Sequence, residues 1–218
     1  MSSYILPRKI QRFEIFRPGM PLKTWLDRQT DKPDILLNCS LYHANGKPIG
    51  TIIADGKMVN NSGGGFGFGT ADGFSVGFGG PWSKAWKEYV TGYYGIVQHG
   101  KAVSKPWSDG YVFNQKLSRI AFGQLKDGRY AVFTANGVNI DQMAVQGVQA
   151  GFESLCNLDG GGSAIMVFDG KIINRPSGNG DARKLLDMIV IGEYLDGGEL
   201  HGVTPSPVPT ATTEGAGN

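Results

Sequence analysis

The stretch Leu155-Cys-Asn-Leu-Asp-Gly-Gly-Gly-Ser-Ala-Ile-Met-Val-Phe168 places two short apolar runs on either side of three consecutive glycines. The runs 155–158 and 164–168 each have the length and apolar content of a buried strand. Asp159 opens the connection between them. A two-residue hairpin turn needs only one glycine, so three in a row indicate a backbone that does more than reverse direction. The stretch therefore predicts two strands joined by a specialised turn.

Short apolar runs separated by turn signals extend outward from this stretch in both directions. Asp-Gly pairs such as 127–128 are typical of tight turns between strands. The expected strands cover residues 10–18, 34–38, 51–54, 93–98, 119–124, 130–134, 171–174 and 185–193. A short helix is expected to start at Pro21. A longer helix is expected over 141–151, capped by Asn139 or Asp141. This order predicts a single α+β domain, built on a mostly antiparallel sheet with two or so packed helices.

Two regions depart from this regular pattern. Residues 63–80 hold nine glycines and four phenylalanines, which indicates irregular strands with one aromatic face; a flexible flap over a site is the other interpretation. From Asp196 the chain turns polar, and prolines and threonines crowd residues 204–213. That composition is typical of a disordered tail or linker. We therefore expect the domain to cover residues 1–195 and the tail to cover 196–218.

The composition excludes several classes of protein. Lys plus Arg is 21 and Asp plus Glu is 19, so the net charge of +2 predicts no nucleic-acid partner. No apolar run approaches the ~18 residues of a membrane span. Residues 1–10 lack the apolar core of a signal peptide, so we expect a cytoplasmic or phage-associated protein, or an extracellular one whose leader was removed. The two cysteines, Cys39 and Cys156, are expected to be free buried thiols.

The segment 157–163 carries the clearest chemical pattern. A strand delivers the carboxylate of Asp159 to a run of three glycines, whose exposed backbone N–H groups can form an anion-binding nest. The hydroxyl of Ser163 follows directly. A carboxylate beside an anion cradle suits a sugar or phosphate ester. The competing interpretation is a glycine-rich hairpin turn in which Asp159 bonds its own backbone.

Two arginines could complete such a site. Arg119 opens an apolar strand, and Arg183 follows a polar loop. A guanidinium at the mouth of a strand can grip a phosphate through two parallel hydrogen bonds. Each is otherwise a surface arginine. The histidines lack the spacing of metal ligands, so no metal site is predicted.

Several blocks of the chain resemble the phosphodiester glycosidase family, and they fall in the same order as in that family. The segment from Asn157 through Val167, followed by Asp169-Gly-Lys and Arg183, resembles its last block. The first block usually reads Asn-Gly-Gly-Phe-Phe, where this chain has Asn38-Cys-Ser-Leu-Tyr. The remaining matching blocks are Asn45-Gly-Lys-Pro-Ile-Gly50, Asp55-Gly-Lys57, Tyr94-Gly-Ile-Val-Gln-His-Gly-Lys101, Arg119-Ile-Ala-Phe-Gly-Gln, Asp127-Gly128 and Asn136-Gly137. The resemblance spans about residues 34–193.

This resemblance implies cleavage of a sugar-1-phosphodiester between the anomeric carbon and the phosphate oxygen, releasing free sugar and a phosphomonoester. It implies phosphate binding by Arg119, Arg183 and the backbone of Gly160, Gly161 and Gly162. Asp159 would stabilise the oxocarbenium-like centre or activate water. Asn38 and Asn157 would orient sugar hydroxyls, and Ser163 would bond the phosphate or Asp159. The aromatic candidates for stacking on a sugar are Tyr42, Trp82 and Trp107.

Two alternatives stay open on the sequence. One is a carbohydrate-binding or phage virion module that keeps the fold without turnover. The other is a hydrolase that cuts the phosphate–oxygen bond. In each case the expected ligand is a sugar phosphate or a cell-wall glycan. No cofactor is required; a divalent cation near Asp159 is compatible with the residues but not demanded by them.

Overall fold

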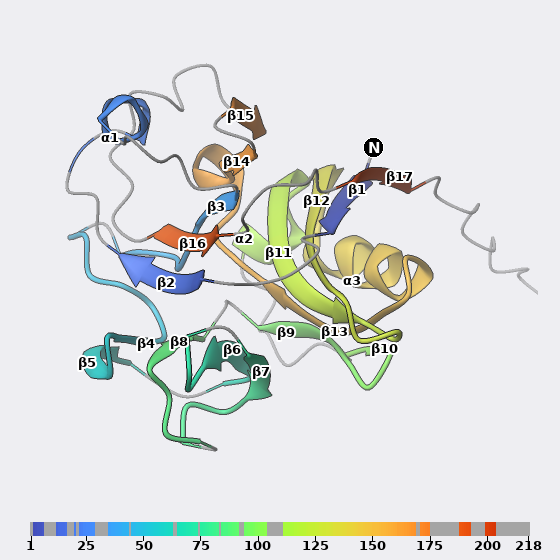
Figure 1. Cartoon of the computed structure of the whole chain (residues 1–218). Coiled ribbons are helices and arrows are strands. Elements are labelled where there is room, and N and C mark those ends of the chain that lie inside the picture. Colours follow the sequence, from blue (N-terminus) through green and yellow to red (C-terminus); the bar gives the residue numbers. More distant parts are fainter. Residues whose placement is uncertain are drawn as a thin grey trace, which may run out of the picture.

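The computed structural model describes residues 2–6, 12–16, 20, 22–28, 35–43, 45–62, 65–73, 75–82, 84–91, 94–103, 111–168, 171–174, 188–192 and 199–203. Within these residues the strands form three antiparallel sheets, with short helices at their margins (Figure 1). The protein is therefore a mostly antiparallel α+β domain, as the order of apolar runs predicted. No helix in the described segments is long and apolar enough to cross a membrane.

The largest sheet has seven strands and supplies most of the framework. In spatial order its strands are β10 (Lys101–Ala102), β9 (Gly95–Gln98), β13 (Phe152–Asn157), β11 (Leu117–Leu125), β12 (Tyr130–Val138), β1 (Ser2–Leu6) and β17 (Glu199–Val203). The two longest strands, β11 and β12, pair as a hairpin through the predicted turn at Asp127 and Gly128. The terminal strands β1 and β17 were not predicted. Strand β17 lies inside the expected tail 196–218, and residues 204–218 of that tail lie outside the described residues.

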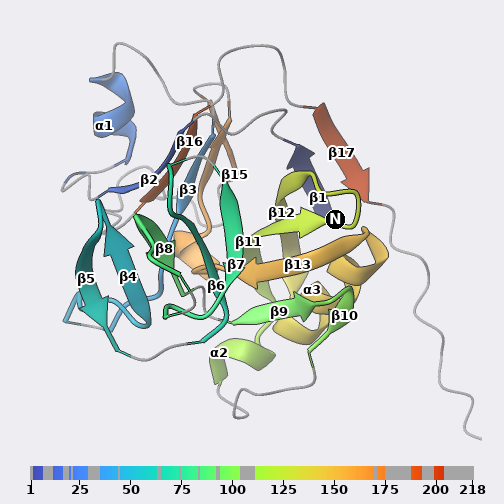
Figure 2. The same ribbon diagram turned by 60° about the horizontal axis from the view of Figure 1, so that its bottom comes forward.

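Two five-stranded sheets pack beside the first (Figure 2). The second sheet runs β15 (Lys171–Asn174), β14 (Met166–Phe168), β3 (Ile35–Asn38), β16 (Met188–Gly192) and β2 (Arg12–Phe16). The third runs β5 (Lys57–Asn61), β4 (Thr51–Ala54), β8 (Glu88–Val90), β6 (Gly67–Thr70) and β7 (Val76–Gly79).

The helices are short and occupy the margins of the sheets. They are α1 (Leu22–Asp27), α2 (Tyr111–Asn114) and α3 (Ile140–Gln149). The predicted cap of the long helix is confirmed, because the Asn139 side chain accepts from the Gln142 backbone while the Gln142 side chain accepts from the Asn139 backbone. This reciprocal capping box satisfies two backbone donors at the start of α3.

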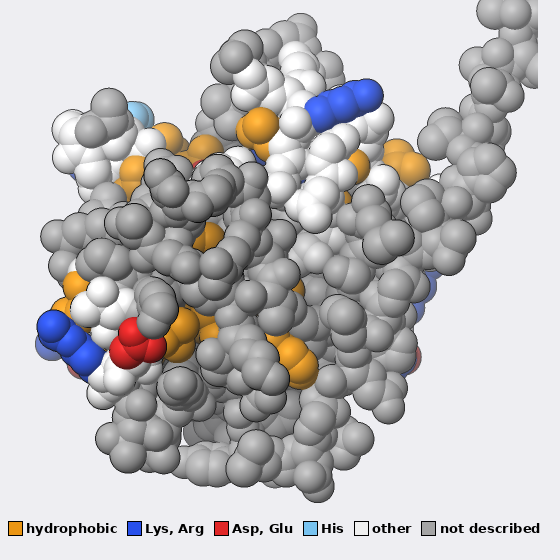
Figure 3. Space-filling model, turned by 90° about the horizontal axis from the view of Figure 1, so that it is seen from above, with side chains coloured by type: hydrophobic (Ala, Val, Ile, Leu, Met, Phe, Trp, Pro, Cys, Tyr) orange, Lys and Arg blue, Asp and Glu red, His pale blue; other side chains and the backbone are white. Residues whose placement is uncertain are grey.

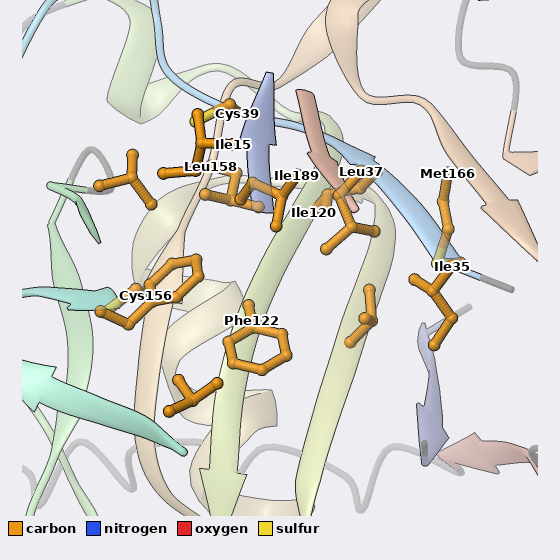
Figure 4. Close-up of a cluster of buried hydrophobic side chains, with 14 of the residues drawn as sticks. Ile15, Ile35, Leu37, Cys39, Ile120, Phe122, Cys156, Leu158, Met166 and Ile189 are labelled. Carbon is orange, nitrogen blue, oxygen red and sulfur yellow. The ribbon is translucent and has the colours of Figure 1, made fainter. Parts of the chain in front are cut away.

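The seven-stranded sheet buries both of its faces. Because side chains alternate along a strand, Ile120 and Phe122 face one way while Ala121 faces the other. The first face packs against the second sheet around Leu37, Met166 and Ile189 (Figure 4). Phe68 of the third sheet belongs to the same cluster. The opposite face packs against α3. Both cysteines are free and buried, as expected. On the surface in Figure 3, the described hydrophobic side chains emerge only in separate small patches.

The glycine-rich stretch forms strands β6 and β7 rather than a flap. Strand β6 is central, between β7 and β8, and all four of its residues are buried. A Cβ atom on Gly67 or Gly69 would collide with the backbone of β8. The glycines therefore allow a close approach of two backbones, and Phe68 and Phe78 contribute the expected aromatic face toward Phe122.

A buried carboxylate joins the second and third sheets. Glu88 is 3% exposed, and its Oε2 accepts a hydrogen bond from the backbone N–H of Ile15 in β2 at 3.0 Å. Its Oε1 accepts from the N–H of Asp55, in the turn after β4, at 2.9 Å. One side chain thus satisfies a backbone donor in β2 and another in the turn between β4 and β5.

Replacing Glu88 by alanine is expected to lower the free energy of unfolding by about 3 kcal/mol, because one buried and one partly buried N–H group lose a charged acceptor. Urea unfolding followed by circular dichroism measures this. Lys57→Ala, at an exposed position in β5, is the control and should leave the midpoint unchanged. A Glu88→Ala protein as stable as the wild type would contradict the assigned role.

Candidate functional site

The predicted motif is the place where the chain crosses from the seven-stranded sheet to the second sheet (Figure 1). We call residues 158–165 the crossing segment. At its start, Leu158 N–H donates to Ile120 O of β11 at 2.9 Å, which extends the β13–β11 ladder. One residue later, Asp159 N–H donates to Cys39 O at 3.1 Å, beyond the end of β3. At its far end, Ile165 O accepts from Asn38 N–H at 3.2 Å. The segment is therefore held by both sheets.

Strand register brings Arg119 and Asp159 together. In the β11–β13 ladder Ala121 is paired with Asn157, and the bond from Leu158 continues that register toward the ends of the strands. Arg119 consequently lies opposite Asp159, and both lie on the face of the sheet that carries Ala121. The two candidate residues, 40 positions apart in sequence, become cross-strand neighbours.

The Arg119 side chain is buried, at 2% exposed, and is fixed by backbone carbonyls. Its Nε donates to Val138 O at 3.3 Å, and one terminal nitrogen donates to Gln115 O at 3.0 Å. An irregularity in the β11–β12 register near Gly137, whose φ is +70°, allows the Val138 carbonyl to reach the guanidinium. The interpretation of Arg119 as a surface residue is thus wrong.

Burial and the charge of Asp159 shift the pKa of Arg119 in opposite directions. Burial lowers the pKa of Arg119, and the nearby carboxylate of Asp159 raises it, with burial the larger effect. Guanidinium groups stay protonated in proteins nonetheless. A buried cation is costly unless negative charge accompanies it, and the carboxylate of Asp159 supplies such charge here.

The three glycines adopt a backbone that presents donors. Gly161 has a φ of +61°, a conformation that side chains rarely adopt. In the short 3₁₀ turn Gly161–Ser163, the N–H groups of Ser163 and Ala164 bond back to the segment itself. The N–H groups of Gly161 and Gly162 have no acceptor within the described residues. Such a pair of unpaired donors is suited to an anion.

Asp159 also makes the contact expected of a structural turn, since its Oδ1 accepts from Gly160 N–H at 2.9 Å. The two interpretations of the motif are therefore compatible. A Cβ atom on Gly160 would lie 3.1 Å from Ser118 O and 3.4 Å from a terminal nitrogen of Arg119. Gly160 thus packs directly against the arginine.

Two buried asparagines border the crossing segment with their carbonyl oxygens unpaired. Asn38 is 2% exposed and donates through Nδ2 to Asp159 O at 2.7 Å; Asn157 is 1% exposed and donates through Nδ2 to Leu158 O at 2.8 Å. These bonds fix the orientation of each amide. Among the described residues, Oδ1 of Asn38 and Oδ1 of Asn157 find no hydrogen-bond donor. Buried polar atoms are nearly always satisfied, so each oxygen is an acceptor that needs a donor such as a water molecule or a hydroxyl group.

The other candidate residues from the sequence differ in their position and exposure. Ser163 is buried at 6% exposed, within the 3₁₀ turn. Tyr42 forms an isolated β-bridge with Pro48, while Trp82 is 68% exposed. Arg183 and Trp107 lie outside the described residues.

One residue of this region was missed by the sequence reasoning. Tyr94 accepts a hydrogen bond through its backbone carbonyl from Asn157 N–H at 3.0 Å. Its φ of +142° is unusual for a residue with a side chain. Tyr94 opens one of the blocks that resemble the family, but only the pairing of β9 with β13 shows that it lies beside Asn157.

The order of the sequence blocks agrees with a comparison against known families. The sequence model of the phosphodiester glycosidase family matches residues 33–192. The chain belongs to this family. No curated protein matches the sequence significantly.

Solved structures show the same fold. The catalytic domain of zebrafish N-acetylglucosamine-1-phosphodiester alpha-N-acetylglucosaminidase, auto-inhibited by its pro-peptide, superimposes with a TM-score of 0.69 at 22% identity, over 84% of this chain and 73% of that one. A hypothetical protein from Synechocystis superimposes with a TM-score of 0.58 at 12% identity, over 88% of this chain and 56% of that one. At these identities the likeness concerns the fold.

Gly160→Ala is expected to weaken binding of inorganic phosphate about tenfold, because the added methyl group pushes against Arg119 and Ser118 O. Calorimetric titration measures the affinity. The matched control is Gly65→Ala, where the new Cβ would meet only Thr91 Cγ2 at 3.4 Å. Equal phosphate affinity in the wild type and Gly160→Ala would show that an anion does not depend on this packing.

Proposed function

We propose that this protein hydrolyses a sugar-1-phosphodiester at the bond between the anomeric carbon and the phosphate oxygen. The products are a free sugar and a phosphomonoester. The observation that carries the proposal is the separate placement of hydrogen-bond donors and acceptors around the crossing segment. Arg119 and the N–H groups of Gly161 and Gly162 offer donors to an anion, whereas Asn38 and Asn157 offer buried acceptors to hydroxyl groups. A sugar phosphate presents both kinds of group.

The phosphate is assigned to Arg119 and to the backbone of Gly160, Gly161 and Gly162, with Arg183 as a further cation. The leaving group is a phosphomonoester, which is a weak base, so its departure needs charge stabilisation more than protonation. A buried guanidinium held by backbone carbonyls needs no rearrangement when that charge develops, which supports this assignment.

Asp159 is assigned to the anomeric carbon. Its carboxylate either stabilises the oxocarbenium-like centre or accepts a proton from the attacking water. The water oxygen forms the new bond to carbon, the carbon–oxygen bond to phosphate breaks, and its electron pair remains on the phosphomonoester. The amide oxygens of Asn38 and Asn157 orient sugar hydroxyls, and Ser163 bonds either the phosphate or Asp159.

We further propose that the reaction needs no metal ion. The positive charge of Arg119 lies near Asp159, and it would repel a divalent cation beside that carboxylate. The substrate is drawn from sugar phosphates or from wall glycans that contain such linkages.

One contact favours the alternative of a binding module without turnover. The bond from Gly160 N–H to Asp159 Oδ1 holds the carboxylate in a structural turn. Cys39 and Ser40, which replace two glycines of the usual first block, also lie directly after Asn38. Release of free sugar from UDP-GlcNAc or a wall-polymer fragment distinguishes the two functions, since a binding module releases none.

Asp159→Asn is expected to reduce sugar release at least ~10³-fold while leaving folding intact, because the amide keeps the shape but cannot take a proton or stabilise positive charge. Quantifying the free reducing sugar measures the rate, and thermal unfolding checks the fold. Asp127→Asn, in the exposed turn after β11, is the matched control. Turnover retained in Asp159→Asn would remove Asp159 from the mechanism.

A further inference from the structure

Tyr94 combines an unfavourable backbone with a position beside the candidate site. Three described residues that are not glycine have a positive φ: Asp55, Tyr94 and His99. Asp55 and His99, at +49° and +52°, lie in tight turns where this conformation is common for Asp and His. Tyr94, at +142°, precedes strand β9 instead. Strained residues of this kind persist where the surrounding structure holds them, and they are concentrated at functional sites.

Strand register sets Tyr94 next to Asn157. The pairing of Cys156 with Gly95 continues through the bond from Asn157 N–H to Tyr94 O. On the other side of Asn157, in β11, stands the small residue Ala121. The three therefore form one row across adjacent strands, and Arg119 and Asp159 form the next row toward the strand ends.

The Tyr94 ring lies on the same face of the sheet as these side chains. It packs against the cluster that contains Ala121, and it meets the Phe113 ring edge-on at 5.8 Å. Phe113 belongs to α2, and Gln115, just after that helix, holds Arg119 through its carbonyl. The ring remains only partly buried. A partly exposed aromatic surface thus borders Asn157, whose Oδ1 lacks a donor among the described residues.

We propose that Tyr94 is an additional substrate-contact residue, whose ring face packs against the sugar beside Asn157. The proposal rests on the proposed function, since it assigns the sugar to this side of the crossing segment and the phosphate to Arg119. The face of an aromatic ring is electron-rich and attracts the C–H groups that line one side of a sugar ring.

Three substitutions separate the ring's contact with substrate from its packing role. Tyr94→Phe keeps the ring, Tyr94→Leu keeps apolar volume against Phe113 without a flat face, and Tyr94→Gly relieves the backbone and removes the side chain. His99→Gly, at the other end of β9, is the matched control for relief of a positive φ. Calorimetric titration is carried out with N-acetylglucosamine 1-phosphate and, separately, with inorganic phosphate.

We expect Tyr94→Leu and Tyr94→Gly to bind N-acetylglucosamine 1-phosphate about tenfold more weakly. In the hydrolysis of UDP-GlcNAc, their KM should be raised and their kcat nearly unchanged, because the lost contact stabilises the bound substrate and the transition state equally. Their affinity for inorganic phosphate should stay within about twofold of wild type, since that anion does not reach the ring. Tyr94→Phe and His99→Gly should bind both probes as wild type does.

The inference would be overturned if Tyr94→Leu and Tyr94→Gly bound the sugar phosphate with wild-type affinity. It would also be overturned if Tyr94→Phe lost as much affinity as these two variants, because the contact would then belong to the hydroxyl group. Equal losses for both probes would indicate a structural role and overturn it too. A wild-type protein that binds the sugar phosphate but releases no sugar contradicts the proposed function, while the binding comparison still decides the role of Tyr94.

Discussion

The crossing of the chain between two sheets depends on a small set of hydrogen bonds around Asp159. Its backbone N–H bonds Cys39 O, and its backbone carbonyl accepts from Asn38 Nδ2. Asn38 and Asp159 are 121 residues apart in sequence. Because the amide of Asn38 is committed to this bond, its oxygen is left pointing away without a donor among the described residues. The same bond that joins the sheets therefore creates a polar group that a ligand can satisfy.

Arg119, the buried cation, likewise belongs both to the framework of the fold and to the candidate site. Arg119 is held by the carbonyls of Val138 and Gln115, so its position follows from the irregular β11–β12 pairing and from the end of α2. A buried cation is costly unless negative charge accompanies it, and the carboxylate of Asp159 lies close enough to raise the pKa of Arg119. In our proposal, a bound phosphate adds negative charge beside this guanidinium.

The parts of this arrangement that could be predicted from sequence are the local ones. The strand before Asp159, the three glycines and the cap of α3 at Asn139 each carry a pattern within a few residues. The proximity of Arg119 to Asp159, the amide bond from Asn38 and the position of Tyr94 depend on which strands pair and in what register. Strand pairing joins distant segments, and no short pattern encodes it. The role of the glycines in β6 could not be predicted for the same reason, because their close approach to β8 exists only after the third sheet forms.

The account is tested most directly by hydrolysis of UDP-GlcNAc in oxygen-18 water, with mass analysis of both products. Arg119 and the glycine donors are assigned to the leaving phosphate and Asp159 to the anomeric carbon, so the water oxygen should enter the sugar. Label in the released N-acetylglucosamine, with none in the phosphate product, is the predicted result. Label in the phosphate would mean that the phosphate–oxygen bond breaks, and it would contradict the assignment of Asp159.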